Sequence, residues 1–138
     1  MVTQVASEPC PALNGMSCEV QAVVSFYGVY NFTAWPEDAS RRAQLDRLFG
    51  DWTPETLRRY SPLYQTHANM PPVLIFQGTN ERLYQPALEY TAQLKEAGAR
   101  HELFLLEGAP HGMENWEGHP EWAQYKQKLV DWLRAVLR

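Results

Sequence analysis

The chain has 138 residues, of which 45% are apolar and 20% are charged, and its formal net charge is −4. This length supports one hydrophobic core, and the charge balance excludes both the basic excess that nucleic acids attract and the extreme acidity of a disordered tail. The charge balance therefore predicts no nucleic-acid partner, and because no run of about 18 apolar residues occurs, we expect no membrane span.

The predicted domain organisation is an irregular lead-in over residues 1–19 and one folded unit over residues 20–138. The lead-in lacks the charged and apolar regions of a signal peptide, so we expect a cytoplasmic protein. It contains both cysteines, Cys10 and Cys18, without the Cys-x-x-Cys spacing of zinc or redox sites. We interpret them as ordinary thiols, with a short-loop disulfide as the alternative in an oxidising compartment.

The folded unit alternates apolar runs with amphipathic segments. Short apolar runs that end near glycine predict buried strands, and apolar residues spaced by three and four predict helices. The predicted strands are 20–27, 73–76 and 102–106, and the predicted helices are 38–49, 54–60, 85–97 and 120–137. This order is typical of an α/β fold with a parallel sheet and right-handed crossovers.

A sheet of three strands leaves the apolar first strand, 20–27, at an edge. An open edge exposes unpaired backbone groups and favours pairing with another strand. We therefore expect the strand to have a neighbour, which is either a second copy of the chain in a homo-oligomer or a complementing N-terminal half of a larger sheet.

Two residues with catalytic chemistry follow neighbouring strands. Glu81 follows the second strand and His111 follows the third, and reactive groups of open parallel sheets gather at these strand ends. A carboxylate that accepts from one imidazole N–H fixes the tautomer and stabilises the imidazolium. Each residue alone is explained as an ordinary loop residue, but their joint placement beside Gly78, Gly108 and Gly112 favours a catalytic pair.

Residues 18–138 resemble the C-terminal half of an α/β-hydrolase superfamily esterase or prolyl-oligopeptidase-like serine hydrolase, on motifs that include Gln77-Gly-Thr-Asn-Glu81 and Gly108-Ala-Pro-His-Gly112. In such enzymes the acid lies in His-Gly-x-x-Asp and the base in Gly-x-x-His-Gly. The resemblance implies a partial α/β-hydrolase fold of about three parallel strands with flanking helices. It also implies that Glu81 and His111 are the acid and base of a Ser-Glu-His triad, with no cofactor. Gln77 and Glu81 depart from the usual histidine and aspartate, and neither change excludes a working pair.

The nucleophile motif of this superfamily, Gly-x-Ser-x-Gly, does not occur in the 138 residues. The resemblance places that serine and the oxyanion hole upstream of Met1. Ser25, near the end of the first strand, is the candidate substitute nucleophile, although an extended strand lacks the exposed turn of a nucleophile elbow. A thiolate from Cys10 or Cys18 is the weaker substitute.

Several aromatic residues are candidates for lining a substrate pocket near the strand ends. They are Tyr27, Tyr30, Trp35 and Trp116. The expected substrate is a small-molecule ester, a peptide or a glycoside.

Two other functions stay open. One is a non-catalytic half-domain that self-associates through its open edge. The other is a carboxylate-based glycoside hydrolase that uses acids at the same sheet end, namely Glu81, Glu107, Glu114 and Glu117. No metal site is expected, because the spacing of His111 and His119 matches no compact ligand pattern.

Overall fold

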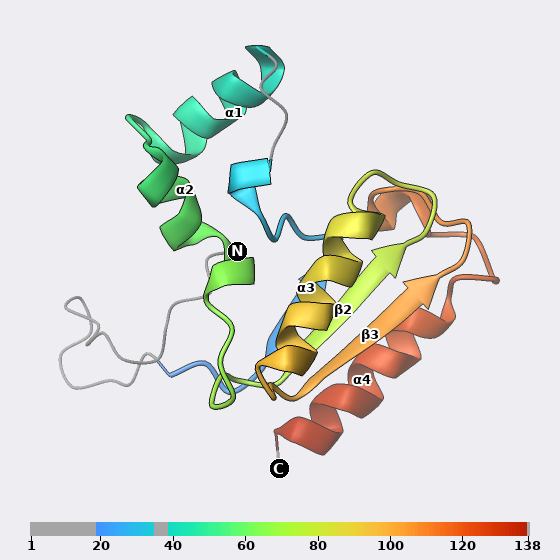
Figure 1. Ribbon diagram of the computed structural model, residues 1–138. Coiled ribbons are helices and arrows are strands. Elements are labelled where there is room, and N and C mark those ends of the chain that lie inside the picture. Colours follow the sequence, from blue (N-terminus) through green and yellow to red (C-terminus); the bar gives the residue numbers. More distant parts are fainter. Residues whose placement is uncertain (1–18, 35–38, 138) are drawn as a thin grey trace, which may run out of the picture.

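The computed structural model describes residues 19–34 and 39–137, so residues 1–18 of the predicted lead-in, with Cys10 and Cys18, lie outside the described residues, as does Trp35 (Figure 1). The elements, in chain order, are β1 (Val23–Phe26), a 3-10 turn (Phe32–Ala34), α1 (Ala39–Phe49), α2 (Pro54–Tyr60), a 3-10 turn (Pro62–Tyr64), β2 (Val73–Gly78), α3 (Tyr84–Glu96), β3 (His101–Leu106), a 3-10 turn (Met113–Asn115) and α4 (Gln124–Val136).

The three strands form one parallel sheet in the order β1-β2-β3. Val73 of the central strand aligns with Val23 on one side and with His101 on the other. The predicted α/β class, the parallel sheet and the three-strand count are therefore confirmed. Within the sheet of the described chain, β1 and β3 are the edge strands.

Each face of the sheet is covered by one helix, α3 on one side and α4 on the other (Figure 1). Successive side chains of a strand point to opposite faces, so β2 contributes to two cores. Val73 and Ile75 pack in the cluster that includes Ala87, Tyr90 and Leu94 of α3. Leu74 and Phe76 pack in the cluster that includes Tyr125 and Trp132 of α4. These four apolar side chains of β2 are fully buried.

Two predicted elements, those expected from residues 20 and 120, begin three or more residues later in the structure. The first strand covers Val23–Phe26, and its four residues are only half-buried, so the expected burial on both faces is wrong for β1. The last helix begins at Gln124 because residues 120–123 form turns, in which Ala123 N–H donates to the Pro120 carbonyl. Trp122 precedes that helix, and its indole N–H donates to the Glu107 carbonyl.

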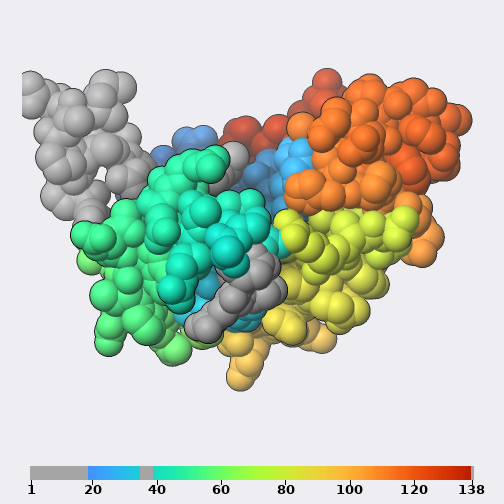
Figure 2. Space-filling model, turned by 90° about the horizontal axis from the view of Figure 1, so that it is seen from above, coloured from blue at the N-terminus to red at the C-terminus, as the bar shows by residue number. Residues whose placement is uncertain are grey.

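Helices α1 and α2 form an arm beside the sheet (Figure 1). Thr53 caps α2 as its hydroxyl accepts from Thr56 N–H, and Pro54 occupies the first turn. The buried Ser61 hydroxyl donates to the Leu57 carbonyl and accepts from Phe32 N–H, which joins the arm to the segment after β1. Figure 2 shows this arm in turquoise and green, across the molecule from the orange connection between β3 and α4.

Across the described ranges, no helix has the length and apolar character needed to cross a membrane.

Candidate active site

The loops that follow β2 and β3 are joined by backbone hydrogen bonds. Thr79 N–H donates to the Leu106 carbonyl at 3.1 Å, and Asn80 N–H donates to the Ala109 carbonyl at 3.1 Å. In return, Gly108 N–H donates to the Thr79 hydroxyl at 2.8 Å. These bonds extend the pairing of β2 with β3 beyond the sheet, so the residues that follow in each loop lie side by side.

Two glycines in these loops are explained by their surroundings. A Cβ on Gly78 would collide with the carbonyl oxygen of Ala109 and crowd that of Pro110, both backbone atoms that cannot rotate away. Gly112 has φ +99°, a conformation that side chains rarely adopt, and a Cβ there would meet the carboxylate of Glu114. Gly78 therefore lets the two loops approach closely, and Gly112 permits the positive φ and the nearby Glu114 carboxylate in the residues after His111.

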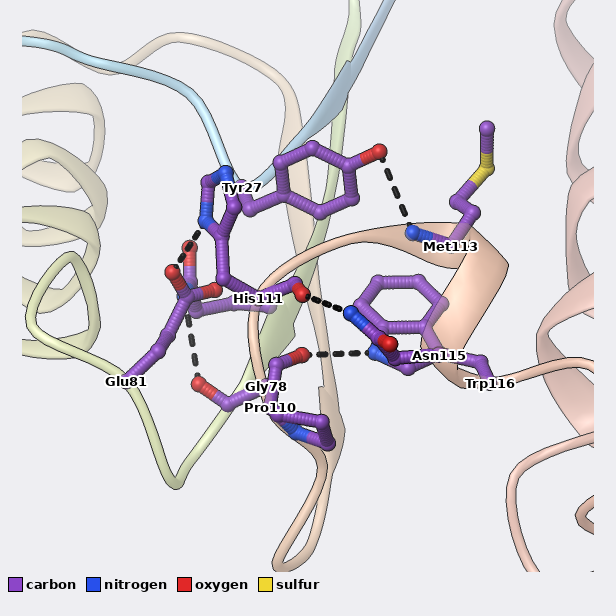
Figure 3. A network of polar contacts seen from close by, with 9 residues as sticks. Tyr27, Gly78, Glu81, Pro110, His111, Met113, Asn115 and Trp116 are labelled. Carbon is purple, nitrogen blue, oxygen red and sulfur yellow. Dashed lines mark hydrogen bonds and ion pairs between the residues drawn. The ribbon is translucent and has the colours of Figure 1, made fainter.

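The side chains of Glu81 and His111 meet at the end of the sheet (Figure 3). Nδ1 of His111 lies 2.5 Å from Oε2 of Glu81. The carboxylate side chain is 3% exposed and the imidazole is 55% exposed. Because a carboxylate oxygen only accepts, Nδ1 carries the proton and the neutral ring has its lone pair on Nε2. An exposed Nε2 of this kind is able to accept a proton from a neighbouring group.

The second oxygen of Glu81 is held by Gln77, which from the sequence is only a departure from the family pattern. Gln77 Nε2 donates to Glu81 Oε1 at 2.5 Å and to the Gly78 carbonyl at 3.1 Å. The Gln77 side chain is fully buried. Each oxygen of the acid therefore has one donor, Gln77 on one side and His111 on the other.

The loop that carries His111 is fixed at three points along its backbone (Figure 3). Trp116 Nε1 donates to the Pro110 carbonyl at 2.7 Å, and Asn115 Nδ2 donates to the His111 carbonyl at 2.6 Å. The Tyr27 hydroxyl accepts from Met113 N–H at 3.2 Å. The base is therefore held by its neighbours in the loop as well as by Glu81.

Tyr27 is the predicted pocket residue that lies beside the pair. Its ring contacts the His111 imidazole, with centroids 4.5 Å apart, and the Trp116 indole edge to face at 5.5 Å. Trp116 is 1% exposed and belongs to the core under α4. Tyr30 is 3% exposed and stacks on Tyr90 in the core under α3. Trp116 and Tyr30 therefore pack in the interior. A pocket-lining role for Tyr27, Tyr30 or Trp116 stays a prediction.

Within the described residues, the hydrogen bond of the Ser25 side chain is to Tyr30 and not to the base. The Ser25 hydroxyl lies 2.7 Å from the Tyr30 hydroxyl. A Cβ on Gly28 would lie 2.6 Å from Ser25 Oγ, so the chain after β1 passes directly over this serine. Burial raises the pKa of Tyr30 to about 12, although the bond to Ser25 opposes this. A tyrosine so reluctant to ionise is a poor base for Ser25, whose role as a substitute nucleophile stays a prediction.

Among the acids of the glycosidase alternative, Glu117 is bound by two other side chains. The Lys126 ammonium and the Tyr125 hydroxyl bind Glu117 and hold its pKa below the usual value. A glycosidase acid requires the opposite, a raised pKa. In the described part of the chain, no three His, Cys, Asp or Glu side chains cluster as metal ligands.

The chain is similar in structure to solved esterases. It aligns with propionate-bound esterase 2 of Thermogutta terrifontis at TM-score 0.70 and 24% identity, over 98% of this chain and 50% of that one. An acetyl ester-xyloside bifunctional hydrolase from Caldicellulosiruptor lactoaceticus aligns at TM-score 0.72 and 17% identity, over 87% and 44%. A truncated carbohydrate esterase from gut microbiota aligns at 0.70 and 20%, over 87% and 44%. The chain thus spans about half the length of these structures, and no curated protein sequence matches it.

The architecture is therefore that of an esterase-type α/β-hydrolase, and the predicted resemblance to the C-terminal half of that fold is confirmed. The chain belongs to the BD-FAE family, whose model matches residues 7–95. The matched range includes Glu81 and ends before His111, so the placement of the imidazole beside the acid rests on the structure alone.

Proposed function

We propose that this chain contributes the acid and the base of a Ser-Glu-His ester hydrolase, with His111 as the general base and Glu81 as the residue that orients it. The observation that carries the proposal is the bond between Nδ1 of the exposed His111 and the buried Glu81 carboxylate, which leaves the other ring nitrogen, Nε2, unbound by the acid. This is the arrangement that an imidazole base needs.

The reaction then follows the acyl-transfer scheme. His111 Nε2 takes the serine proton as the serine oxygen attacks the ester carbonyl, and Glu81 stabilises the imidazolium that forms. The same nitrogen returns the proton to the departing alkoxide, which leaves an acyl-enzyme and an alcohol. Water, deprotonated by His111, then releases the acid and restores the serine.

An ester is the bond we assign to this site. The family is of the esterase type, and all three aligned proteins are named for ester hydrolysis, although the bifunctional hydrolase is named for a xyloside as well. A small-molecule carboxylic ester is therefore the proposed substrate, in preference to a peptide or a glycoside.

We assign the nucleophilic serine to a segment outside these 138 residues, because they contain no Gly-x-Ser-x-Gly. We propose that the segment carrying this serine pairs with the free edge of β1. The N–H groups of Val23 and Tyr27 donate toward β2, so those of Val24 and Phe26 point away from the sheet. A second copy could pair there but would bring no elbow serine. The partner that completes the site is a complementing half of the domain.

The experiment measures p-nitrophenyl acetate hydrolysis by the chain and by its His111→Ala variant. An exposed imidazole with a fixed tautomer activates water, so we expect slow hydrolysis above background that His111→Ala abolishes. His119→Ala is the matched control, because His119 is also exposed and also contacts a glutamate, Glu121, at 3.1 Å. Equal rates for the chain and His111→Ala would instead favour a non-catalytic, self-associating half-domain.

The source of the serine is tested separately by reading the DNA upstream of the Met1 codon in frame. An encoded Gly-x-Ser-x-Gly is the expected result, and co-expression of that segment should raise ester turnover by several orders of magnitude. A segment that binds the chain without raising turnover would contradict the proposed assembly of the site.

A further inference from the structure

Gln77 is a buried polar residue in an otherwise apolar strand. The sequence of β2 is Val-Leu-Ile-Phe-Gln-Gly, and the Gln77 side chain is fully buried. Burial of an amide costs free energy unless its donors and acceptor are paired. Gln77 Oε1 accepts no hydrogen bond from any described residue. An apolar side chain of the same length would fill this space without an unpaired acceptor, so stability of the strand does not explain the amide.

The orientation of the amide is determined by its neighbours. The two atoms that face Nε2 are both acceptors, the Gly78 carbonyl at 3.1 Å and Glu81 Oε1 at 2.5 Å. The reverse orientation would place three oxygens together, so the nitrogen must be on this side. Gln77 therefore donates to the acid and cannot accept from it.

We infer that Gln77 is a positioning residue for His111 that acts through Glu81, an inference that rests on the proposed function. By holding Oε1, the amide fixes the rotation of the carboxylate, so Oε2 faces His111 Nδ1 at 2.5 Å. A carboxylate with a free oxygen would rotate, and the imidazole would lose the partner that fixes its tautomer. The amide carries no titratable proton, so its N–H donors do not depend on pH.

The test reads the tautomer of His111 directly by long-range ¹H–¹⁵N NMR of the labelled chain at about pH 9, where unperturbed imidazoles are neutral. We expect the Nδ1–H tautomer in the unmodified chain. Gln77→Met keeps the length of the side chain and removes the donor, and it should shift the tautomer ratio toward Nε2–H by about tenfold. Gln77→His keeps an N–H donor at this position, so, unlike Gln77→Met, it should keep the Nδ1–H tautomer of His111.

The matched control is Gln93→Met. Gln93 also donates to a glutamate, Glu96, at 3.3 Å, but on the exposed surface of α3 and away from His111. It should leave the His111 tautomer unchanged. If Gln77→Met does not fold, Gln77→Asn serves instead, because it keeps an amide and shortens its reach by one methylene. The same shift toward Nε2–H is expected.

An unchanged His111 tautomer in folded Gln77→Met or Gln77→Asn protein overturns the inference. The measurement needs no substrate, so it is separate from the proposed activity. If the unmodified chain does not hydrolyse the ester but Gln77→Met alters the His111 tautomer, the proposed function is contradicted and the role of Gln77 is supported. Ester hydrolysis that is lost in Gln77→Met with an unaltered tautomer contradicts the role of Gln77 alone.

Discussion

The ring of Tyr27 lies against the imidazole of His111, with their centroids 4.5 Å apart. Tyr27 has φ +39°, and within the described ranges it is the one non-glycine residue with a positive φ. This conformation costs about 1–3 kcal/mol for a bulky side chain. The strained turn after β1 places the tyrosine under the loop of the base, where its hydroxyl accepts from Met113 N–H.

Tyr27→Phe tests this anchor. The substitution keeps the ring beside His111 and removes the acceptor of Met113 N–H, so we expect a loss of about 1 kcal/mol in local stability and roughly fivefold faster exchange of the Met113 amide proton. Tyr64→Phe is the control, because its hydroxyl bonds to the exposed Thr33 side chain. Unchanged Met113 exchange in Tyr27→Phe would show that the hydroxyl does not hold the loop.

Gly78→Ala tests the close approach of the two site loops. The new Cβ would collide with the Ala109 carbonyl oxygen, so we expect a loss of about 1–3 kcal/mol in the free energy of unfolding, measured with urea, and a weaker contact between Glu81 and His111. Gly108→Ala in the neighbouring loop is the control. Its new Cβ has open space, so only the backbone strain of a positive φ should lower the stability. A smaller loss of unfolding free energy in Gly78→Ala than in Gly108→Ala would contradict the close contact between Gly78 and the Ala109 carbonyl.

Alkaline pH should destabilise the core under α3. Burial raises the pKa of Tyr30 to about 12, and burial together with the neighbouring Tyr30 raises the pKa of Tyr90 to about 12. Unfolded tyrosines ionise near pH 10. Below that pH both states keep the proton and stability does not change. Between about pH 10 and about pH 12 only the unfolded state ionises, so stability falls by on the order of 2 kcal/mol per tyrosine.

The measurement compares urea unfolding at about pH 9 and about pH 11. Tyr30→Phe keeps the ring stacked on Tyr90 and should make the decrease clearly smaller. Tyr60→Phe, which removes an exposed hydroxyl, should leave the decrease as it is. An equal decrease in Tyr30→Phe and in the unmodified chain would contradict the assignment to Tyr30.

The free edge of β1 predicts self-association when no complementing half is present. Val24→Pro removes an N–H that points away from the sheet, so it should keep the fold and abolish association. Val23→Pro removes the donor to the Pro72 carbonyl and should destabilise the sheet itself. Light scattering at tens of micromolar measures the mass. A monomeric unmodified chain that binds no apolar dye would contradict an exposed edge.

The layered fold could be predicted from the sequence because each element has a strong local signal. The continuous apolar run at residues 73–76 and the glycine after α3 require little tertiary context. The ends of an element were harder to predict where tertiary contacts determine them. The last helix begins late because residues 120–123 form turns in which the Trp122 indole bonds the Glu107 carbonyl, a contact that no periodicity shows.

The site was predictable as a pair of residues but not as a network. Glu81 and His111 follow adjacent strands, and parallel strand ends meet at one edge. The donor role of Gln77 depends on which way a buried amide turns, and the anchor at Tyr27 depends on a left-handed backbone conformation that is rare for tyrosine. Neither feature has a signature in a single sequence.

The central claim, that Glu81 orients His111 for catalysis, is tested most directly by p-nitrophenyl acetate hydrolysis with Glu81→Gln. The amide keeps the size of the side chain, but its NH₂ group favours the wrong imidazole tautomer, so we expect the rate to fall to that of His111→Ala. Glu121→Gln is the control, since Glu121 contacts the exposed His119. A Glu81→Gln rate equal to that of the unmodified chain would contradict the claim.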